Sequence, residues 1–431
     1  MALISPWHEL PAIAALGWCD RQSVESYQDR KLLQLVRHVY SSNSFYRRLW
    51  DQAGFDPSRF KGREDLYRLP LVTKQQVRSL TALLREKPPA GCGRLIWHNT
   101  SGSSGEPFSL VRSWREERFL ALIRMMAMHG IGFRPWHRRA RVRVPADFDW
   151  LDDRPLRVLN KAGLYRGHIF SCYLPMDVLW KQISDYAPDA LNGYSETVAR
   201  VARYGLEAQL RDIRPKLVFV GGELCTPMMS RQMAEAFQAP VYQAYAATEC
   251  NLIALSCERS GLLHICDPTV LVEVLDDGGK PVAEGESGTA VVTVLHSRVM
   301  PFVRYVLGDR VVQGPAPCSC GAPYGTLQSI DGREIDRLRL SNGETVHAYV
   351  LLNILLLSDT SWIRQYQLLQ DEPGFIDVHI WPMRTPEPEV LEYLRSKLQE
   401  KTAGTVIRMK LVDGMELDSG GKFRLCRCSL D

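Results

Sequence analysis

The sequence predicts an α/β fold with a large N-terminal domain and a small α+β C-terminal domain. Segments with strand and helix patterns alternate through much of the chain, a β-rich section follows, and short strands and helices fill the part after residue 336. A length of 431 residues is too great for one simple core and fits a large domain followed by a smaller one. We therefore expect mixed sheets with helices, and two domains at 1–336 and 337–431.

The expected elements follow from periodicity and turn signals. Apolar residues recur at helical spacing from Leu32 to Tyr40, and Thr73 with Gln76 has the spacing of a capping box that starts another helix. A third helix is expected from about Pro227. Apolar or alternating runs predict strands at 94–97, 139–144, 217–220, 240–242, 271–275 and 289–295.

The composition excludes several classes of protein. A hydrophobic content of 45% and a charged content of 24% are ordinary for a globular enzyme, and a net charge of +4 is too small to imply a nucleic-acid partner. The most apolar run, 350–357, is too short to span a bilayer, and the first residues lack a signal-peptide pattern. Eleven cysteines, an odd number, favour a reducing compartment. We expect a cytoplasmic enzyme with no membrane partner.

The most informative stretch is 100–107, Thr-Ser-Gly-Ser-Ser-Gly-Glu-Pro. Glycines allow a close approach to a ligand and positive φ angles, and hydroxyl and backbone N–H groups donate hydrogen bonds to an anion. The strand expected before this stretch would bring it to a strand end, where α/β sheets usually bind ligands. Taken alone, the stretch is equally compatible with a flexible surface loop.

Five further motifs follow in order. They are Val-Gly-Gly-Glu at 220–223, Tyr-Ala-Ala-Thr-Glu at 245–249, Tyr-Val-Leu-Gly-Asp at 305–309, Gly-Arg-Glu-Ile-Asp at 332–336 and Gly-Gly-Lys-Phe-Arg at 420–424. In this order and spacing the chain resembles the adenylate-forming enzymes, specifically the phenylacetate–CoA ligases and the related capsule-biosynthesis adenylating proteins. It differs from many relatives in having Ala246 in place of glycine, and Glu106 and Phe108 near the position where they carry lysine.

The resemblance implies ATP-dependent activation of a carboxylic acid, with release of pyrophosphate. Catalysis is then mainly positioning and electrostatic stabilisation. The implied phosphate-binding residues are Thr100, Ser101, Gly102, Ser103, Ser104 and Gly105, and the implied adenine- and ribose-binding residues are Gly221, Gly222, Glu223, Tyr245 and Asp309.

Four residues receive catalytic roles from the resemblance. Glu249 is the implied Mg²⁺ ligand, since a hard cation prefers carboxylate oxygen, and Thr248 would reach the α-phosphate. Arg333 would contact ribose or phosphate, and Lys422 would bridge the carboxylate and the α-phosphate.

Each assignment also has a structural interpretation. Asp309 and Arg333 are compatible with a loop cap and a surface ion pair, and Glu249 with an acid at a helix start. Lys422, in a glycine-rich turn, is compatible with a solvated side chain.

The resemblance places the acyl pocket near a short turn. The implied substrate-binding residues are Gly193, Tyr194, Ser195, Ala246 and Ala247, and they suit an aromatic or unsaturated acid. Core packing explains these residues as well. Arginines at 134, 138, 139, 141 and 143 form either a solvated strand face or a docking site for CoA phosphates or an acidic carrier protein.

The acceptor is expected to be the thiol of CoA or of a carrier protein's pantetheine, and the alternative is an amine. The stretch 338–347 is closer to the capsule-type branch than to the CoA ligases. Asp336 is the implied hinge, about which the small domain would rotate between half-reactions. Relatives often form dimers, so a homodimer is expected.

A second group of residues predicts a metal site. Cys257 and His264 are separated by six residues, and Cys318 and Cys320 follow in a loop. Three thiolates and one imidazole suit a closed tetrahedral Zn²⁺ site of structural type, with Cys266 as the substitute ligand. The alternative is a set of cysteines packed as small apolar residues.

Two unrelated functions remain open at this stage. A kinase or GTPase-like enzyme could use the glycine loop, although that loop has no Gly-Lys-Ser/Thr and such an enzyme would release ADP. The other open function is that of a non-catalytic nucleotide-binding protein whose fold is stabilised by zinc.

Overall fold

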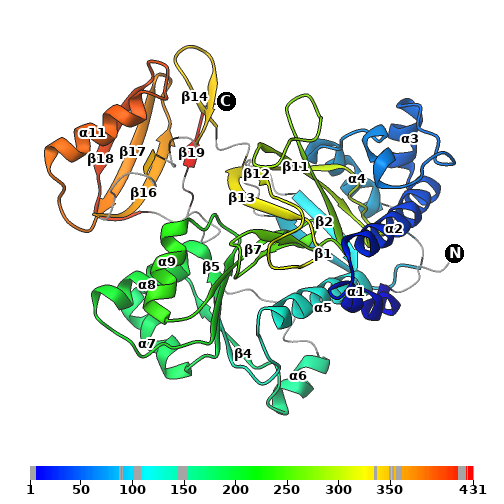
Figure 1. The fold of residues 1–431 in the computed structure, drawn as a ribbon, viewed down its shortest axis with the longest axis horizontal. Coiled ribbons are helices and arrows are strands. Elements are labelled where there is room, and N and C mark those ends of the chain that lie inside the picture. Colours follow the sequence, from blue (N-terminus) through cyan, green and yellow to red (C-terminus); the bar gives the residue numbers. More distant parts are fainter. Residues whose placement is uncertain are drawn as a thin grey trace. The chain divides into compact units, whose positions relative to one another are not determined.

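The computed structural model describes residues 6–86, 89, 91–100, 108–143, 154–333, 337–348, 351, 354–355, 362–415, 424 and 426–430. Backbone contacts divide the chain into two compact units (Figure 1). The first unit comprises residues 1–134 and 242–330, and the second comprises 135–241 and 331–431. The predicted domain boundary at 336 falls outside the described residues and stays a prediction.

The first unit begins with helices. They are α1 (Leu10–Leu16), α2 (Arg21–Ser42), α3 (Ser44–Gln52), α4 (Lys74–Glu86) and α5 (Trp114–Gly130), with short 3₁₀ turns at Pro6–Glu9 and Arg63–Arg68. The apolar stripe predicted from Leu32 onward lies on α2, where Leu32, Leu35 and Val36 are fully buried. The capping box is confirmed, because the backbone N–H of Gln76 donates to Thr73 Oγ1 and that of Thr73 donates to Gln76 Oε1.

The strands of the first unit form two groups. One is an antiparallel hairpin of β1 (Leu95–Thr100) and β2 (Phe108–Ser113). The other has the order β10-β11-β12-β13-β9-β8-β7. Its members are β7 (Val241–Ala247), β8 (Asn251–Ser256), β9 (Leu263–Ile265), β10 (Val270–Leu275), β11 (Ser287–Val294), β12 (Tyr305–Gln313) and β13 (Thr326–Arg333).

Two details of this unit differ from the expectation. The strand expected at 94–97 before the 101–107 stretch is present as β1 and extends to Thr100, but it pairs with β2 in a two-stranded antiparallel sheet. The short strand expected at 240–242 continues to Ala247, because β7 pairs with β8 from Ala244↔Leu255 to Ala247↔Asn251. The Tyr245 motif therefore begins on a strand, with a register shift between Tyr245 and Ala246.

The second unit contains a parallel sheet with the order β6-β5-β3-β4. Its strands are β3 (Arg139–Arg143), β4 (Gly167–Ser171), β5 (Ala190–Tyr194) and β6 (Leu217–Gly221), and its helices are α6 (Arg154–Lys161), α7 (Met176–Tyr186), α8 (Ser195–Glu207) and α9 (Pro227–Phe237). Arg139 and Arg141, on the central strand β3, are buried, at 5% and 4% exposure. The interpretation of these two arginines as a solvated strand face is wrong.

The C-terminal part of the second unit has its own sheet, in the order β18-β17-β16-β19, and its own apolar core (Figure 1). Its elements are β14 (Arg337–Arg339), β15 (Thr345–His347), β16 (Ile363–Gln370), β17 (Phe375–Pro382), α11 (Pro388–Gln399), β18 (Val406–Leu411) and β19 (Cys426–Cys428). Leu394 and Leu398 bring α11 onto this core. Among the described helices of the whole chain, none has the length and apolar character needed to cross a membrane.

Candidate functional site

Thr248 and Glu249 lie in the turn between β7 and β8, in the first unit. The hydroxyl of Tyr305, at the start of β12, donates a hydrogen bond to Glu249 Oε1 at 3.1 Å. Tyr305 is only 1% exposed, and burial followed by the Glu249 charge raises the pKa of its phenol, which keeps it a donor. The interpretation of Glu249 as an acid at a helix start is wrong, because this turn joins two strands.

Asp309 lies on β12 beside Tyr245 of β7. The Tyr245 hydroxyl donates to Asp309 Oδ2 at 2.7 Å, and the tyrosine is 6% exposed. Asp309 is partly exposed, and Gly308 before it has a φ of +79°, a conformation that favours glycine. The structure thus joins the 245–249 and 305–309 motifs twice, through Tyr245–Asp309 and through Tyr305–Glu249.

A third link reaches the same turn from the β1–β2 hairpin. The guanidinium of Arg112, on β2, donates to the carbonyl oxygen of Thr248 and to Glu117 Oε2, the second contact at 3.1 Å. Neither Arg112 nor the Tyr305 contact appears among the residues predicted from sequence. Tyr305 could have been found as the first residue of its motif, whereas no local pattern singles out Arg112.

In the second unit the structure joins two other predicted motifs. The Ser195 hydroxyl donates to the carbonyl oxygen of Glu223 at 3.1 Å, and the backbone N–H of Glu196 donates to Glu223 Oε2 at 3.0 Å. The Glu223 carboxylate therefore holds the first turn of α8, where an acid is favoured by the helix dipole. Ser195 is fully buried, so its hydroxyl serves the contact between these motifs.

Two glycines of these motifs allow close packing. Gly222 has a φ of +79°, and a Cβ there would lie 3.2 Å from the ring of Tyr194. A Cβ at Gly193 would lie 2.6 Å from the carbonyl oxygen of Val142, which only glycine avoids. Tyr194 is thus packed over the backbone of the 220–223 turn, and burial raises its pKa.

Several predicted residues lie outside the described part of the chain. They are Ser101, Gly102, Ser103, Ser104 and Gly105 of the phosphate loop, the hinge Asp336 and Lys422. Thr100 and Arg333 lie on described strands, β1 and β13, but their side chains are not described. Their roles stay predictions. Ala246 is exposed and Ala247 partly exposed on β7.

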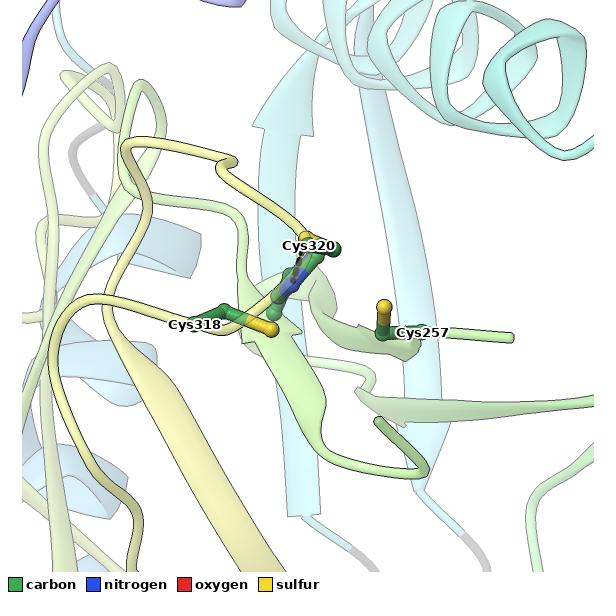
Figure 2. Close-up of side chains that lie close together, drawn as sticks. Cys257, Cys318 and Cys320 are labelled. Atoms are coloured by element: carbon green, nitrogen blue, oxygen red, sulfur yellow. Dashed lines mark hydrogen bonds between the residues drawn. The ribbon is translucent and has the colours of Figure 1, made fainter. Parts of the chain in front are cut away.

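The four predicted metal ligands come together in the first unit. One ligand atom from each of Cys257, His264, Cys318 and Cys320 lies within 4.8 Å of the others (Figure 2). In Figure 2, Cys318 and Cys257 approach from opposite sides, and a dashed line marks the contact of Cys320 Sγ with His264 Nε2 at 3.4 Å. Cys266 is not in this group, and Thr269 Oγ1 donates to its sulfur instead. We call these four residues the Cys/His cluster.

The donor set and spacing fit a tetrahedral zinc ion. Zn–S and Zn–N bonds of about 2.3 and 2.0 Å place sulfur and nitrogen about 3.5 Å apart, close to the 3.4 Å between Cys320 and His264. The backbone N–H of Ala322 also donates to Cys320 Sγ, which stabilises a thiolate. Although burial acts to raise it, hydrogen bonds from the Ser260 side chain and from backbone N–H groups lower the pKa of Cys257 to about 7.

A cavity of about 470 Å³ adjoins the Cys/His cluster within the first unit. Ile123 and Met126 of α5 and Leu252 and Leu255 of β8 supply much of its apolar lining, while Cys257, His264 and Cys320 line it on the side of the cluster. The cavity gives small reagents a route to these ligands.

The chain is similar to known proteins in sequence and in fold. No protein-family model matches the chain. It is 27% identical over 403 residues to a phenylacetate–coenzyme A ligase of Thermus thermophilus, and the aligned region covers 85% of this chain and 83% of that enzyme. It is also 22% identical over 324 residues to protein CapK of Staphylococcus aureus, covering 72% and 68% of the two chains.

Among solved structures, a 2-hydroxyisobutyryl-CoA ligase in the postadenylation state superposes with a TM-score of 0.75, 22% identity and coverage of 95% of this chain and 89% of that one. A benzoate CoA ligase from Burkholderia xenovorans gives 0.58 at 15% identity, covering 78% and 68%. The fold is therefore that of the adenylate-forming ligases. Together with the sequence relatives, these similarities support an adenylate-forming enzyme of the phenylacetate–CoA ligase branch.

Proposed function

We propose that this enzyme activates a carboxylic acid with ATP and transfers the acyl group to the thiol of coenzyme A. In the first half-reaction a carboxylate oxygen attacks the α-phosphorus, and the bond to the bridging oxygen of pyrophosphate breaks. Acyl-adenylate and pyrophosphate result. In the second half-reaction a thiolate attacks the acyl carbon, AMP leaves, and a thioester forms.

The observation that supports this proposal most is the meeting of motifs around the β7–β8 turn. Tyr305 and Arg112 each bind the Thr248–Glu249 turn, and Tyr245 binds Asp309. The 245–249 and 305–309 motifs and the strands flanking the 101–107 loop are therefore mutually fixed within one unit. The strand–loop–strand connection also argues against a GTPase-like enzyme with a Walker-type loop, since such a loop leads into a helix.

The residues of this turn have roles that suit phosphoryl chemistry. We assign Glu249 as a ligand of Mg²⁺, since its carboxylate is partly exposed and its second oxygen remains for a cation while Oε1 accepts from Tyr305. Bound Mg²⁺ would neutralise charge on the phosphate oxygens. Thr248 is assigned to the α-phosphate and Asp309 to the ribose hydroxyls. Each of these groups is preorganised by the contacts above, so little reorganisation accompanies the reaction.

The remaining assignments rest on the resemblance. The residues of 100–105 would bind the β- and γ-phosphates, Arg333 ribose or phosphate, and Lys422 the α-phosphate and the attacking carboxylate. Rotation of the C-terminal domain about Asp336 would exchange Lys422 for the thiol acceptor.

An aromatic or unsaturated acid is the proposed substrate class. Tyr194, packed over Gly222 in the second unit, offers an apolar ring beside the 220–223 turn. The resemblance also assigns Ala246 and Ala247 of β7, which have small side chains, to the substrate. A carrier-protein pantetheine is an alternative thiol acceptor, and an amine is a further one.

We propose that the Cys/His cluster holds a structural zinc ion. All four ligands come from the protein, so no position remains for substrate. Its thiols stay available for metal in a reducing compartment, which fits a cytoplasmic location and eleven free cysteines. A homodimer remains the expected assembly.

Carboxylate-dependent ATP–pyrophosphate exchange tests this function. Benzoic, phenylacetic, cinnamic and fatty acids would be compared, with Lys422→Ala beside the matched control Lys401→Ala, an exposed lysine of the same C-terminal segment. We expect exchange with one class of acid, lost in Lys422→Ala and retained in Lys401→Ala. ADP as the nucleotide product, or ATP binding without exchange for any acid, would contradict adenylation.

The acceptor is tested separately. Hydroxylamine traps an acyl-adenylate whatever the natural acceptor, and mass spectrometry of products made with CoA, a pantetheinylated carrier protein or an amine identifies the acceptor. A thioester formed with CoA supports the proposal, while an amide formed without thioester would favour the amine alternative.

A further inference from the structure

Arg112 is the buried centre of a partly exposed polar chain that reaches Thr248 in the β7–β8 turn, which we call the catalytic turn after its proposed role. His98 on β1 contacts Glu117 Oε2 through Nε2 at 3.0 Å, and Arg112 on β2 binds the same oxygen at 3.1 Å. The other end of the guanidinium donates to the carbonyl oxygen of Thr248. The chain thus runs from β1 through α5 and β2 to the β7–β8 turn, and all of it lies in the first unit.

Charge and the burial of Arg112 strengthen the contacts of this series of side chains. The Arg112 side chain is 5% exposed, so its hydrogen bonds compete little with water. Burial acts to raise the pKa of Glu117, but the His98 hydrogen bond and the Arg112 charge lower it to about 2, so the carboxylate is charged at neutral pH. A charged donor that binds a carboxylate and a carbonyl together forms strong, directional bonds.

The backbone around Arg112 is also fixed. Arg112 pairs with Ile96 across the hairpin. The next residue, Ser113, caps α5 in a capping box with Glu116, whose other carboxylate oxygen accepts from the backbone N–H of Val299. The backbone position of Arg112 is therefore set by a strand pair, a helix start and a loop, independently of the turn that its side chain contacts.

The contact with Thr248 has a consequence for the reaction. The β1–β2 hairpin flanks residues 101–107, assigned to phosphate binding, and the turn carries Thr248 and Glu249, assigned to the α-phosphate and Mg²⁺. These two groups must act on one triphosphate at the same time. A shift of about 1 Å between such groups costs about 100-fold in rate.

We infer that Arg112 is a positioning residue for adenylation: through the Thr248 carbonyl it holds the catalytic turn in register with the phosphate-loop hairpin. This role rests on the proposed function. It is confined to the half-reaction that uses the triphosphate, because the thioester-forming step starts from an adenylate whose pyrophosphate has already left.

The test separates the two half-reactions in the full-length enzyme. Arg112→Met and Arg112→Lys would be measured in ATP–pyrophosphate exchange with the most active acid of the panel, and in thioester formation from the synthetic acyl-adenylate and CoA. Glu117→Gln keeps the Thr248 contact and removes the charged partner of Arg112. Arg63→Met is the matched control, since Arg63 pairs with Glu25 and Asp29 far along the sequence from the turn.

For Arg112→Met we expect exchange kcat to fall about 100-fold with the KM for ATP changed less than about threefold. Thioester formation from supplied adenylate should stay within about threefold of wild type. Arg112→Lys should recover part of the loss, since a lysine still donates to a carbonyl, and Glu117→Gln should cost less than Arg112→Met. Arg63→Met should retain both half-reactions.

Three results would overturn the inference. If the wild type shows exchange and a folded Arg112→Met variant shows it at the same rate, Arg112 has no positioning role, while the proposed function stands. Equal losses in both half-reactions, matched by Glu117→Gln and by a lower melting temperature, would make the chain purely structural. Absence of exchange in the wild type would overturn the proposed function and the inference with it.

Discussion

The β7–β8 turn, to which we assign a catalytic role, and the Cys/His cluster are held together by different kinds of contact. Each joins segments of the first unit that are far apart in sequence. At the turn, Arg112 and Tyr305 supply hydrogen bonds to Thr248 and Glu249. At the cluster, three thiols and one imidazole face one another, with no cation among the protein's own side chains in the group.

The turn and the cluster differ in whether they need a bound ion. The turn pairs donors with acceptors, so its geometry is complete without any bound ion. The thiols of the cluster oppose one another: burial first, and then Cys318 and Cys257, raise the pKa of Cys320. Such a group can ionise fully only around a cation. Changes at the turn should therefore act on rate, and changes at the cluster on stability and metal content.

The largest effect is expected for Glu249→Gln. Losing a charged group that acts on the transition state should lower carboxylate-dependent exchange about 100- to 1,000-fold, with little change in melting temperature. Asp51→Asn is the control, because Asp51 accepts from Tyr40 at 2.8 Å as Glu249 accepts from Tyr305, but near the N-terminus. If Glu249→Gln retained wild-type exchange, Glu249 and its turn would have no catalytic role.

A smaller loss of rate is expected for Tyr305→Phe. The substitution removes one hydrogen bond to a carboxylate and keeps the buried ring, so exchange should fall about 10-fold, which corresponds to about 1.4 kcal/mol. Tyr40→Phe makes the same chemical change at the control pair. If both variants retained full exchange, the hydroxyl of Tyr305 would have no part in orienting Glu249.

Cys318→Ser should act on stability instead. We expect about one zinc per chain in the wild type by elemental analysis, most of it lost in the variant, and a melting temperature lower by about 5–10 °C. The adenylation rate of the purified variant, measured below its melting transition, should stay within about threefold of the wild-type rate. Cys19→Ser, which changes an exposed cysteine, should leave zinc and melting unchanged. Metal-free wild type with the melting temperature of untreated enzyme would contradict a stabilising zinc.

The smallest effect concerns the pH dependence of the metal-free protein. The pKa of Cys257 is lowered from 9.0 to about 7, so its ionisation favours the folded state above the unfolded value and this contribution is lost as pH falls towards 7. After removal of metal with a chelator, the ionisation of Cys257 should raise the melting temperature by about 1–2 °C between pH 7 and pH 8.5. Cys257→Ser should lack that part of the slope. An identical slope in both proteins would show that Cys257 does not titrate in this window.

Much of the site was predictable because its motifs are local. Glu249 and Asp309 stand in short patterns whose order along the chain resembles that of the adenylate-forming enzymes. The metal ligands stand in two spaced pairs that suit zinc, Cys257 with His264 and Cys318 with Cys320. The buried arginines were misjudged for a related reason. Arg139 and Arg141 alternate along β3 as in a half-exposed strand, and only the packing of the whole unit buries that face.

The sequence by itself determined the fold class, two helix starts, the family resemblance and the identity of the candidate ligands, because periodicity, capping and motif order are properties of neighbouring residues. The tertiary structure alone decided which distant residues meet. Arg112 and Thr248 are separated by 136 positions, and Tyr305 and Glu249 by 56. Their contacts arise from strand pairing and burial across the whole unit, which no local pattern of side chains encodes.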